Sequence, residues 1–300
     1  MPNTLAHMGI QALATQAVYK KADLKWVYLG AVIPDLPWIL QRLIPFVWKD
    51  IDRLDLRLYA IVQASLFFCL ILCAGFALYS SRPKNTFFIL AYGALIHLLL
   101  DALQIKWANG VHLLAPFNWR LLNFALFWPE SLPTYLITAF GLLYALLFWK
   151  RSAGAPFLLA IRTAKESAVG ILFVLTYLLL PLALLDGPEA SDNHFVLTLR
   201  SIDDRPGKVI EIDRADYEHH PKGGSLHLFN GERFKVDGFD PGRSGLFSIK
   251  GFFSQQDRIQ VRESHRHRFF RDAASYMGLG FIALLWTCSG LRAWRRLKTK

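Results

Sequence analysis

The sequence predicts an α-helical integral membrane protein of six or seven helices that carries a small all-β insert near its C-terminus. Hydrophobic residues make up 53% of the 300-residue chain and charged residues only 19%, below the quarter that soluble domains usually contain. The apolar residues form long runs separated by short polar segments, as in membrane proteins. One stretch near the C-terminus departs from this pattern and has short β-favouring runs between turn residues.

Six apolar runs are long enough to cross a bilayer as helices, which takes roughly 20 residues. They lie at 27–45, 58–80, 86–106, 129–149, 166–185 and 273–291. A seventh run at 4–19 is shorter and less apolar, so it is a short span, a re-entrant helix or an interfacial helix. We expect residues 1–186 to form a helical membrane domain and residues 272–300 to form a last spanning helix with a basic tail.

Residues 187–271 are expected to form a β-rich domain outside the cytoplasm. Six short runs of β-favouring residues alternate there with Gly, Pro and Asp, at 195–201, 208–213, 225–229, 233–238, 246–251 and 257–263. Five or six short strands in about 85 residues predict a small all-β domain, either an OB-like barrel or a sandwich.

The placement of basic residues predicts the orientation. The insert is nearly neutral, with 14 Lys and Arg against 13 Asp and Glu, so the net charge of +11 belongs to the segments that flank the helices. With a cytoplasmic C-terminus, 14 basic residues fall inside and six in the short outer loops, as the positive-inside rule requires. We therefore expect a multi-pass protein of the bacterial inner membrane, with lipids as neighbours and no nucleic-acid partner. The oligomeric state is left open.

Four ionisable residues interrupt the apolar runs, where a charged group costs about 2.5–3.5 kcal/mol. Asp35 lies between two prolines, His97 and Asp101 are four residues apart on one helix face, and His7 lies in the first run. In the predicted orientation all four lie at mid-depth or in the outer half of the membrane. They form a plausible set of ligands for a divalent ion, zinc first, with manganese or magnesium as alternatives.

Each of these residues also has a structural interpretation. His97 and Asp101 could form a hydrogen-bonded pair that holds helices together. Asp35 could cap the kink that Pro34 and Pro37 produce, and His7 could be an interfacial histidine. The metal-site hypothesis therefore depends on all four residues meeting.

Other polar residues are weaker candidates. His112 and Glu130 lie in loops near the expected mouth of the site, where either could support the metal or transfer a proton, or be solvated. Two histidine pairs in the insert, His219-His220 and His265-x-His267, resemble chelating pairs but are more typical of surface residues.

Longer motifs surround the four candidate ligands: PNTLAHMGIQ, LGAVIPDLPW, ALIHLLLDAL and GVHLLAPFNW. Over about residues 1–150 the chain resembles the LexA-regulated, inner-membrane, metal-dependent hydrolase family (YdjM-like). The elements of the family pattern match His7, Pro34-Asp35, His97 with Asp101, and the Gly-x-x-Leu-Leu-x-Pro segment at 110–116. The resemblance implies a membrane-embedded hydrolase whose metal these His and Asp residues hold.

The chain departs from that family at two places. The family's second motif has a His-Arg-Gly-x-Thr-His-Ser element, whereas this chain has LYAIVQASLF at 58–67, where only Gln63 and Ser65 are similar. The aspartate that often follows Pro-Asp by two residues is Pro37 here. Because these histidines are missing, the chain could also be a relative of the family that binds metal but does not catalyse hydrolysis.

Two functional hypotheses follow. The first is a membrane-embedded, metal-dependent hydrolase acting on an ester or phosphoester, such as a lipid or another envelope component, at the outer face of the membrane. The second is a non-catalytic membrane protein whose intramembrane His and Asp are structural and whose β-domain binds an envelope partner.

Overall fold

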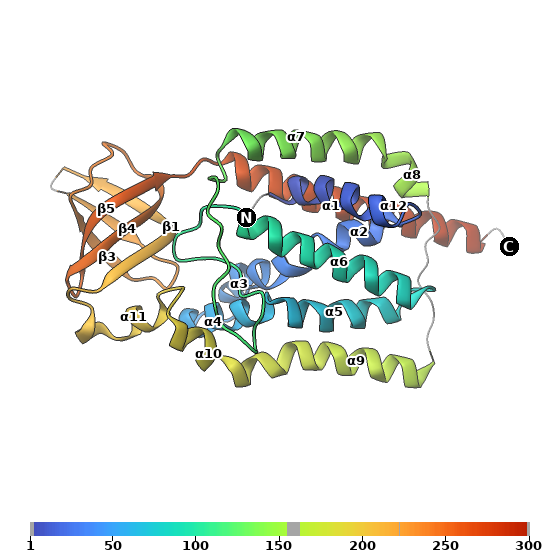
Figure 1. Cartoon of the computed structure of the whole chain (residues 1–300), viewed down its shortest axis with the longest axis horizontal. Helices are drawn as coiled ribbons and strands as arrows, with labels where there is room; N and C mark the ends of the chain where they lie inside the picture. The colour runs from blue at the N-terminus through green and yellow to red at the C-terminus, as the bar shows by residue number, and fades with distance from the viewer. Residues whose placement is uncertain (1–2, 155–162, 222, 299–300) are drawn as a thin grey trace.

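The structure, a computed structural model, describes residues 3–154, 163–221 and 223–298. The molecule is elongated, with a helical bundle at one end and a β-barrel at the other (Figure 1). Several helices run along its length, among them α5 (Leu66–Leu78), α6 (Pro83–Ala102), α7 (Leu132–Leu147), α9 (Ala164–Leu179) and α12 (Phe270–Lys298) (Figure 1). Helix α12 leads from the barrel along the whole bundle, so it joins the two parts covalently.

Among the residues that the structure describes, four helical stretches are long and apolar enough to cross a membrane: Leu24–Val47, Pro83–Ala102, Ala164–Leu184 and Phe270–Arg292. Helices α4 (Arg53–Gln63) and α5 would together make a fifth, but they meet at 70°. Helix α7 has 16 residues, fewer than the roughly 20 that a straight span requires. The chain is thus a helical membrane protein with a β-domain, and the predicted count of six or seven spans is not confirmed.

The outer helices present apolar side chains on the bundle surface. Helix α9 is the clearest case, because Ile171, Leu172 and Leu179 are all more than half exposed. Helix α7 exposes a similar row, with Leu136, Leu143 and Leu147. Exposed apolar surface of this extent is typical of a helix that faces lipid.

Helix α1 (Thr4–Val18) packs against α7, α12, α2 (Leu24–Gly30) and α6 within the bundle. Glycines permit this close packing: a Cβ on Gly141 of α7 would lie 1.9 Å from the carbonyl oxygen of Leu5, and one on Gly9 would lie 2.4 Å from the Cα of Gly141. Small residues let helix backbones approach in membrane proteins. The run at 4–19 is therefore a 15-residue helix held by its neighbours, with His7 buried.

The predicted break at the prolines is present. Helix α2 ends at Gly30, a 3₁₀ turn η1 covers Ile33–Asp35, and α3 (Leu36–Val47) follows. Pro34 and Pro37 each lie in the first turn of a helical segment, where N–H groups have no partner within the helix. Within the turn the Asp35 amide donates to the Val32 carbonyl, as a 3₁₀ turn requires, so the Ala31 carbonyl lacks its α-helical donor.

The run predicted at 86–106 ends early, since α6 stops at Ala102 and residues 103–131 form a long loop. This loop docks on the barrel. The Ala108 amide donates to Glu211 at 2.8 Å, Asn109 donates to Asp213 at 3.1 Å, and Lys250 of the barrel lies over the Trp107 ring. The loop therefore connects the end of α6 to the β-domain.

The β-domain is a closed five-stranded barrel in the order β1-β2-β3-β5-β4, so the sandwich alternative is wrong. Its strands are β1 (Val209–His220), β2 (Gly223–His227), β3 (Arg233–Asp237), β4 (Gly245–Gln255) and β5 (Arg258–Arg266). Neighbouring strands pair antiparallel except β3 and β5, which are parallel. Alternating residues such as Ile210, Phe234 and Phe253 point inward and fill the barrel core.

The strand predicted at 195–201 is wrong, because these residues form the short helix α11 (Val196–Arg200). Helices α10 (Asp186–Ser191) and η2 (Leu180–Leu184) precede it, and η3 (Ile202–Asp204) follows. Asp192 accepts hydrogen bonds from the Thr198 amide and hydroxyl, which stabilises a helical turn. A short apolar run fits a helix or a strand equally well, so this local contact decides.

Candidate metal centre

The four predicted ligands meet at the end of the bundle nearest the barrel. His7 comes from α1, Asp35 from η1, and His97 and Asp101 from α6, and each is at most 8% exposed. The Nε2 atom of His7 lies 3.3 Å from Asp101 Oδ1, and the Nε2 atom of His97 lies 3.5 Å from Asp35 Oδ1 and 3.8 Å from Asp101 Oδ2. Three elements distant in sequence thus bring two imidazoles and two carboxylates together.

The proline break determines the orientation of His97. Its Nδ1 atom lies 2.8 Å from the Ala31 carbonyl oxygen, the acceptor that the 3₁₀ turn releases. A carbonyl only accepts, so Nδ1 carries a hydrogen and Nε2 of the neutral ring presents its lone pair to the carboxylates. Histidines that bind metal ions usually have their second nitrogen held in this way.

His7 lies face to face with His97. Their ring centroids are 3.7 Å apart and their planes differ by 4°. His7 Nδ1 has no hydrogen-bond partner among the described residues, and Nε2 has only the 3.3 Å contact with Asp101 Oδ1, although the side chain is fully buried. A buried polar group without a good hydrogen bond is costly, and a ligand bound at Nε2 would offset that cost.

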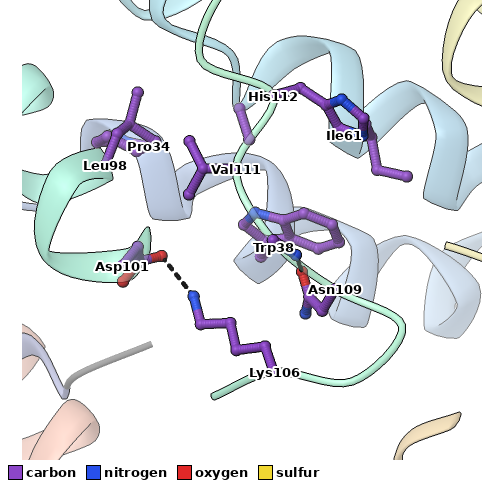
Figure 2. A pocket seen from close by; sticks show the side chains of 11 residues that line it. Pro34, Trp38, Ile61, Leu98, Asp101, Lys106, Asn109, Val111 and His112 are labelled. Carbon is purple, nitrogen blue, oxygen red and sulfur yellow. Dashed lines mark hydrogen bonds and ion pairs between the residues drawn. The ribbon is translucent and has the colours of Figure 1, made fainter. Parts of the chain in front are cut away.

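Lys106 is a member of the site that the sequence reasoning did not single out. Its Nζ lies 3.1 Å from Asp101 Oδ2, and both side chains are buried (Figure 2). The early end of α6 allows this contact, because Lys106 lies in the loop that turns back over the helix end. Lys106 therefore compensates one oxygen of Asp101, while the other oxygen faces His7.

The donor set fits a divalent ion. Nitrogen and oxygen ligands lie about 2.0–2.2 Å from zinc, so two ligands of one ion lie about 3–3.6 Å apart. The contacts that join His7 and His97 to the carboxylates are 3.3–3.8 Å, longer than ordinary hydrogen bonds. His7, His97 and Asp101 could thus hold a metal ion, with Asp35 beside them.

Two small pockets reach the cluster. One, of about 20 Å³, is lined by Asp101, Lys106, Trp38 and His112 (Figure 2), and has room for about one water molecule. The other, of about 80 Å³, is lined by Asp35 and Trp38 among others, and also by two basic residues, Arg42 and Arg271. Trp38 therefore borders both openings.

His112 lies on the wall of the smaller pocket rather than among the four ligand side chains. Its ring lies near Trp119 and near the buried His194, with ring centroids 5.9 Å and 5.4 Å away. Burial lowers the pKa of His112 to about 4, so the ring is neutral at neutral pH. His194 had no predicted role, and nothing in the local sequence pattern marks it.

From the sequence, Glu130 was expected either to support the bundle metal site or to be solvated, and the structure shows neither arrangement. Glu130 is bound by His265 and His267 of the barrel, a second cluster that the sequence reasoning missed. Glu130 is 135 positions from His265 and 137 positions from His267, so no sequence motif could have predicted their contact. His219 and His220 are at the barrel surface beside Asp240 and Glu218.

Comparisons of the chain with models of protein families, with curated proteins and with solved structures found no match. The fold and the site together define a helical membrane protein with a β-barrel domain and a buried His/Asp cluster that could hold a metal ion.

Proposed function

We propose that this chain is a membrane-embedded, metal-dependent hydrolase whose metal is bound by His7, Asp35, His97 and Asp101. The observation that carries the proposal is the meeting of these four buried side chains. Within the part of the chain that the structure describes, the Nε2 atoms of both histidines and one oxygen of each aspartate form no ordinary hydrogen bond. A bound divalent ion supplies Lewis acidity, which lowers the pKa of water to about 7 and so provides a nucleophile at neutral pH.

The two histidines would hold the metal together with the carboxylates. The rings of His7 and His97 are stacked, with centroids 3.7 Å apart. His7 Nε2 faces Asp101 Oδ1, and His97 Nε2 faces Asp101 Oδ2 and Asp35 Oδ1. His7, His97 and Asp101 would therefore be the ligands, with Asp35 beside them.

The surrounding residues favour an anionic substrate such as a phosphoester. Arg42 lines the pocket that opens beside Asp35, with Arg271 and Asp272 also in its wall, and a guanidinium group such as that of Arg42 matches the geometry of phosphate oxygens. Lys106 holds Asp101 in place and adds a positive charge beside the smaller pocket. His112, with its lowered pKa, is a weak base, and its proposed role is to hydrogen-bond water in that pocket.

The resemblance to the YdjM-like hydrolases supports the same proposal for residues 1–150. In the segment that replaces the family's second motif, Gln63 donates to the Tyr59 hydroxyl within α4 and to the Tyr177 carbonyl of α9. The four proposed ligands would therefore act without ligands from that motif. We further propose a bacterial inner-membrane location with a cytoplasmic C-terminus, an outward-facing, OB-like barrel and a lipid or envelope ester as substrate.

The alternative, a non-catalytic scaffold, is favoured by one observation. Lys106 already compensates Asp101, and a protonated His97 would place a positive charge between Asp35 and Asp101 without any metal. Such a cluster would hold α1, η1 and α6 together as a buried ionic network.

Metal analysis of the detergent-purified chain separates the two functions. The protein is stripped with a chelator, reloaded with Zn²⁺ or Mn²⁺, and assayed for bound metal and for hydrolysis of phosphomonoesters, phosphodiesters and phospholipids. The proposal predicts metal that is lost in His97→Ala and Asp35→Ala but retained in the surface control His219→Ala. Folded wild-type protein that binds no metal at this cluster would establish the scaffold instead.

A further inference from the structure

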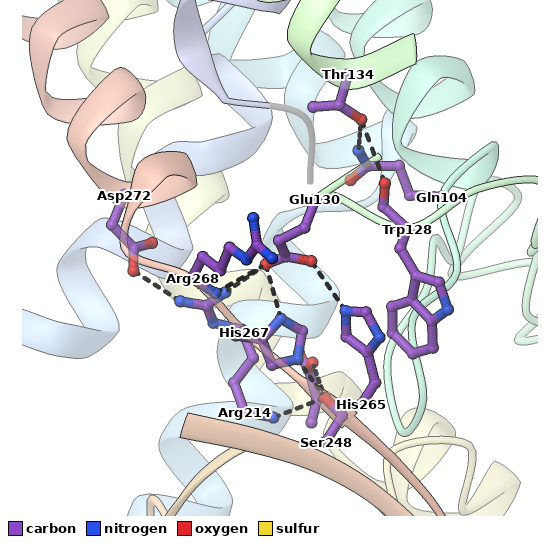
Figure 3. Close-up of polar contacts among 11 residues, drawn as sticks. Gln104, Trp128, Glu130, Thr134, Arg214, Ser248, His265, His267, Arg268 and Asp272 are labelled. Atoms are coloured by element: carbon purple, nitrogen blue, oxygen red, sulfur yellow. Dashed lines mark hydrogen bonds and ion pairs between the residues drawn. The ribbon is translucent and has the colours of Figure 1, made fainter. Parts of the chain in front are cut away.

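The contact between Glu130 and two barrel histidines lies where the barrel meets the bundle (Figure 3). Glu130 lies near the end of the long loop before α7, His265 lies near the end of β5, and His267 follows that strand. Glu130 Oε2 is 3.1 Å from His265 Nε2, and Glu130 Oε1 is 3.0 Å from His267 Nδ1. One carboxylate therefore faces two imidazoles from a different part of the fold.

Hydrogen positions around His267 follow from its other partner. Ser248 has one hydroxyl hydrogen, which it donates to Asp213 at 3.1 Å. The contact of 2.8 Å between Ser248 Oγ and His267 Nε2 then requires that Nε2 carry a hydrogen and donate it. In the neutral ring, Nδ1 of His267 therefore has a lone pair and no hydrogen. Two hydrogen-bond acceptors, His267 Nδ1 and Glu130 Oε1, then face each other.

His265 is held in place by stacking. Its ring lies 3.6 Å from the Trp128 ring with an interplanar angle of 3°. Trp128 in turn contacts the edge of Trp107, and its carbonyl accepts a hydrogen bond from Thr134. The Nε2 atom that faces Glu130 is thus preorganised by residues of the loop rather than of the barrel.

We propose that Glu130, His265 and His267 form a second metal site, which binds one divalent ion, zinc by ligand type, and fastens the barrel to the helical bundle. Two histidines and a glutamate are an established zinc ligand set with room for a further ligand. A cation between them would satisfy the lone pairs that now face each other. The Ser248–Asp213 chain behind His267 is the support that ligating histidines commonly have.

A nearby arginine does not occupy the position. Arg214 Nη1 is 4.0 Å from Glu130 Oε1, but its Nη2 binds Asp272 at 2.6 Å, so the guanidinium is directed to the start of α12 (Figure 3). The site shares no ligand with the cluster in the bundle. The inference therefore stands or falls independently of the proposed hydrolase.

The test counts metal ions in full-length protein reloaded with zinc after chelation. We expect His265→Ala and His267→Ala each to lose one equivalent relative to wild type, while His97→Ala keeps that equivalent. A double variant of two surface histidines of the same barrel, His219→Ala with His220→Ala, is the control and should lose none. Unchanged metal content in the His265 and His267 variants would overturn the proposal and leave an ionic contact.

A ligand-preserving variant excludes an effect of misfolding. In cobalt-loaded His265→Cys, a thiolate ligand should add a sulfur-to-metal charge-transfer band that wild type and Ser264→Cys, one residue away, do not show. Absence of that band in folded, cobalt-loaded His265→Cys would contradict ligation by residue 265.

Discussion

His97 donates its Nδ1 hydrogen to the carbonyl of Ala31 across the break between α2 and α3. The two residues are 66 positions apart, and the bond exists because the 3₁₀ turn at Pro34 removes the donor that an α-helix would supply to Ala31. A helix break in one segment thus orients an imidazole in another, which points its Nε2 at Asp35 and Asp101.

This relationship predicts that Pro34→Ala weakens metal binding although Pro34 offers no ligand. An alanine amide would let the helix continue, so that the Asp35 amide could bond Ala31 and release His97. Loss of such support typically costs 10–100-fold in metal affinity, so we expect a decrease of about 10–100-fold in a zinc titration. Pro37→Ala, in the first turn of α3, is the matched control and should bind normally. Equal affinity in both variants would refute the orienting role of the break.

Lys106→Met should destabilise the metal-free protein and tighten metal binding. The change leaves Asp101 buried without its cation, and removing one partner of a buried pair costs about 3–5 kcal/mol. It also removes a positive charge beside the proposed metal, so we expect at least a tenfold gain in affinity, about 1.4 kcal/mol. Thermal unfolding with and without zinc measures both effects. Lys235→Met, which breaks an exposed pair with Asp257, should change neither quantity noticeably.

Gly141→Ala should displace α1 and with it His7. The added Cβ would lie 1.9 Å from the Leu5 carbonyl oxygen, a backbone atom that moves only if the helix moves. We expect a loss of about 1–3 kcal/mol from overpacking, together with reduced metal binding in the bundle. The control is Gly280→Ala on α12, where nothing lies within 4 Å of the new Cβ and the free energy of unfolding should be unchanged or slightly higher. Full metal content in a folded Gly141→Ala protein would show that His7 is dispensable.

Burial of His112 predicts a loss of stability in acid. Its pKa falls from 6.5 in the unfolded chain to about 4 in the folded protein, chiefly because of burial. The neutral form is therefore favoured on folding: stability is complete above pH 6.5 and decreases as the pH falls toward 4. The 2.5-unit difference corresponds to about 3 kcal/mol.

Unfolding of wild type and His112→Asn between pH 7.5 and 4 measures this contribution. The variant should lose less stability over that range, because asparagine does not titrate. His194, Lys106 and Asp101 also line or face this region, and they are unchanged in the variant. Identical pH profiles would show that His112 titrates near its ordinary pKa.

Local sequence patterns predicted the parts of the fold that depend on near neighbours in the chain. Long apolar runs marked the membrane helices, and the prolines around Asp35 marked the break. Alternating residues marked five strands of the barrel. The same local patterns gave the wrong prediction at 195–201, because a short apolar run fits a helix and a strand equally well. They also did not determine how many helices cross the membrane.

The sequence by itself determined which residue types could bind a metal, because ionisable groups in apolar segments are costly and therefore conspicuous. Only the tertiary structure decided which of them meet. It brought His7 onto His97 through a close crossing of α1 with α7, turned Lys106 back to Asp101, and joined Glu130 to two histidines in the barrel. These contacts link residues from separate segments, and their geometry depends on how whole helices and strands pack, which no local periodicity encodes.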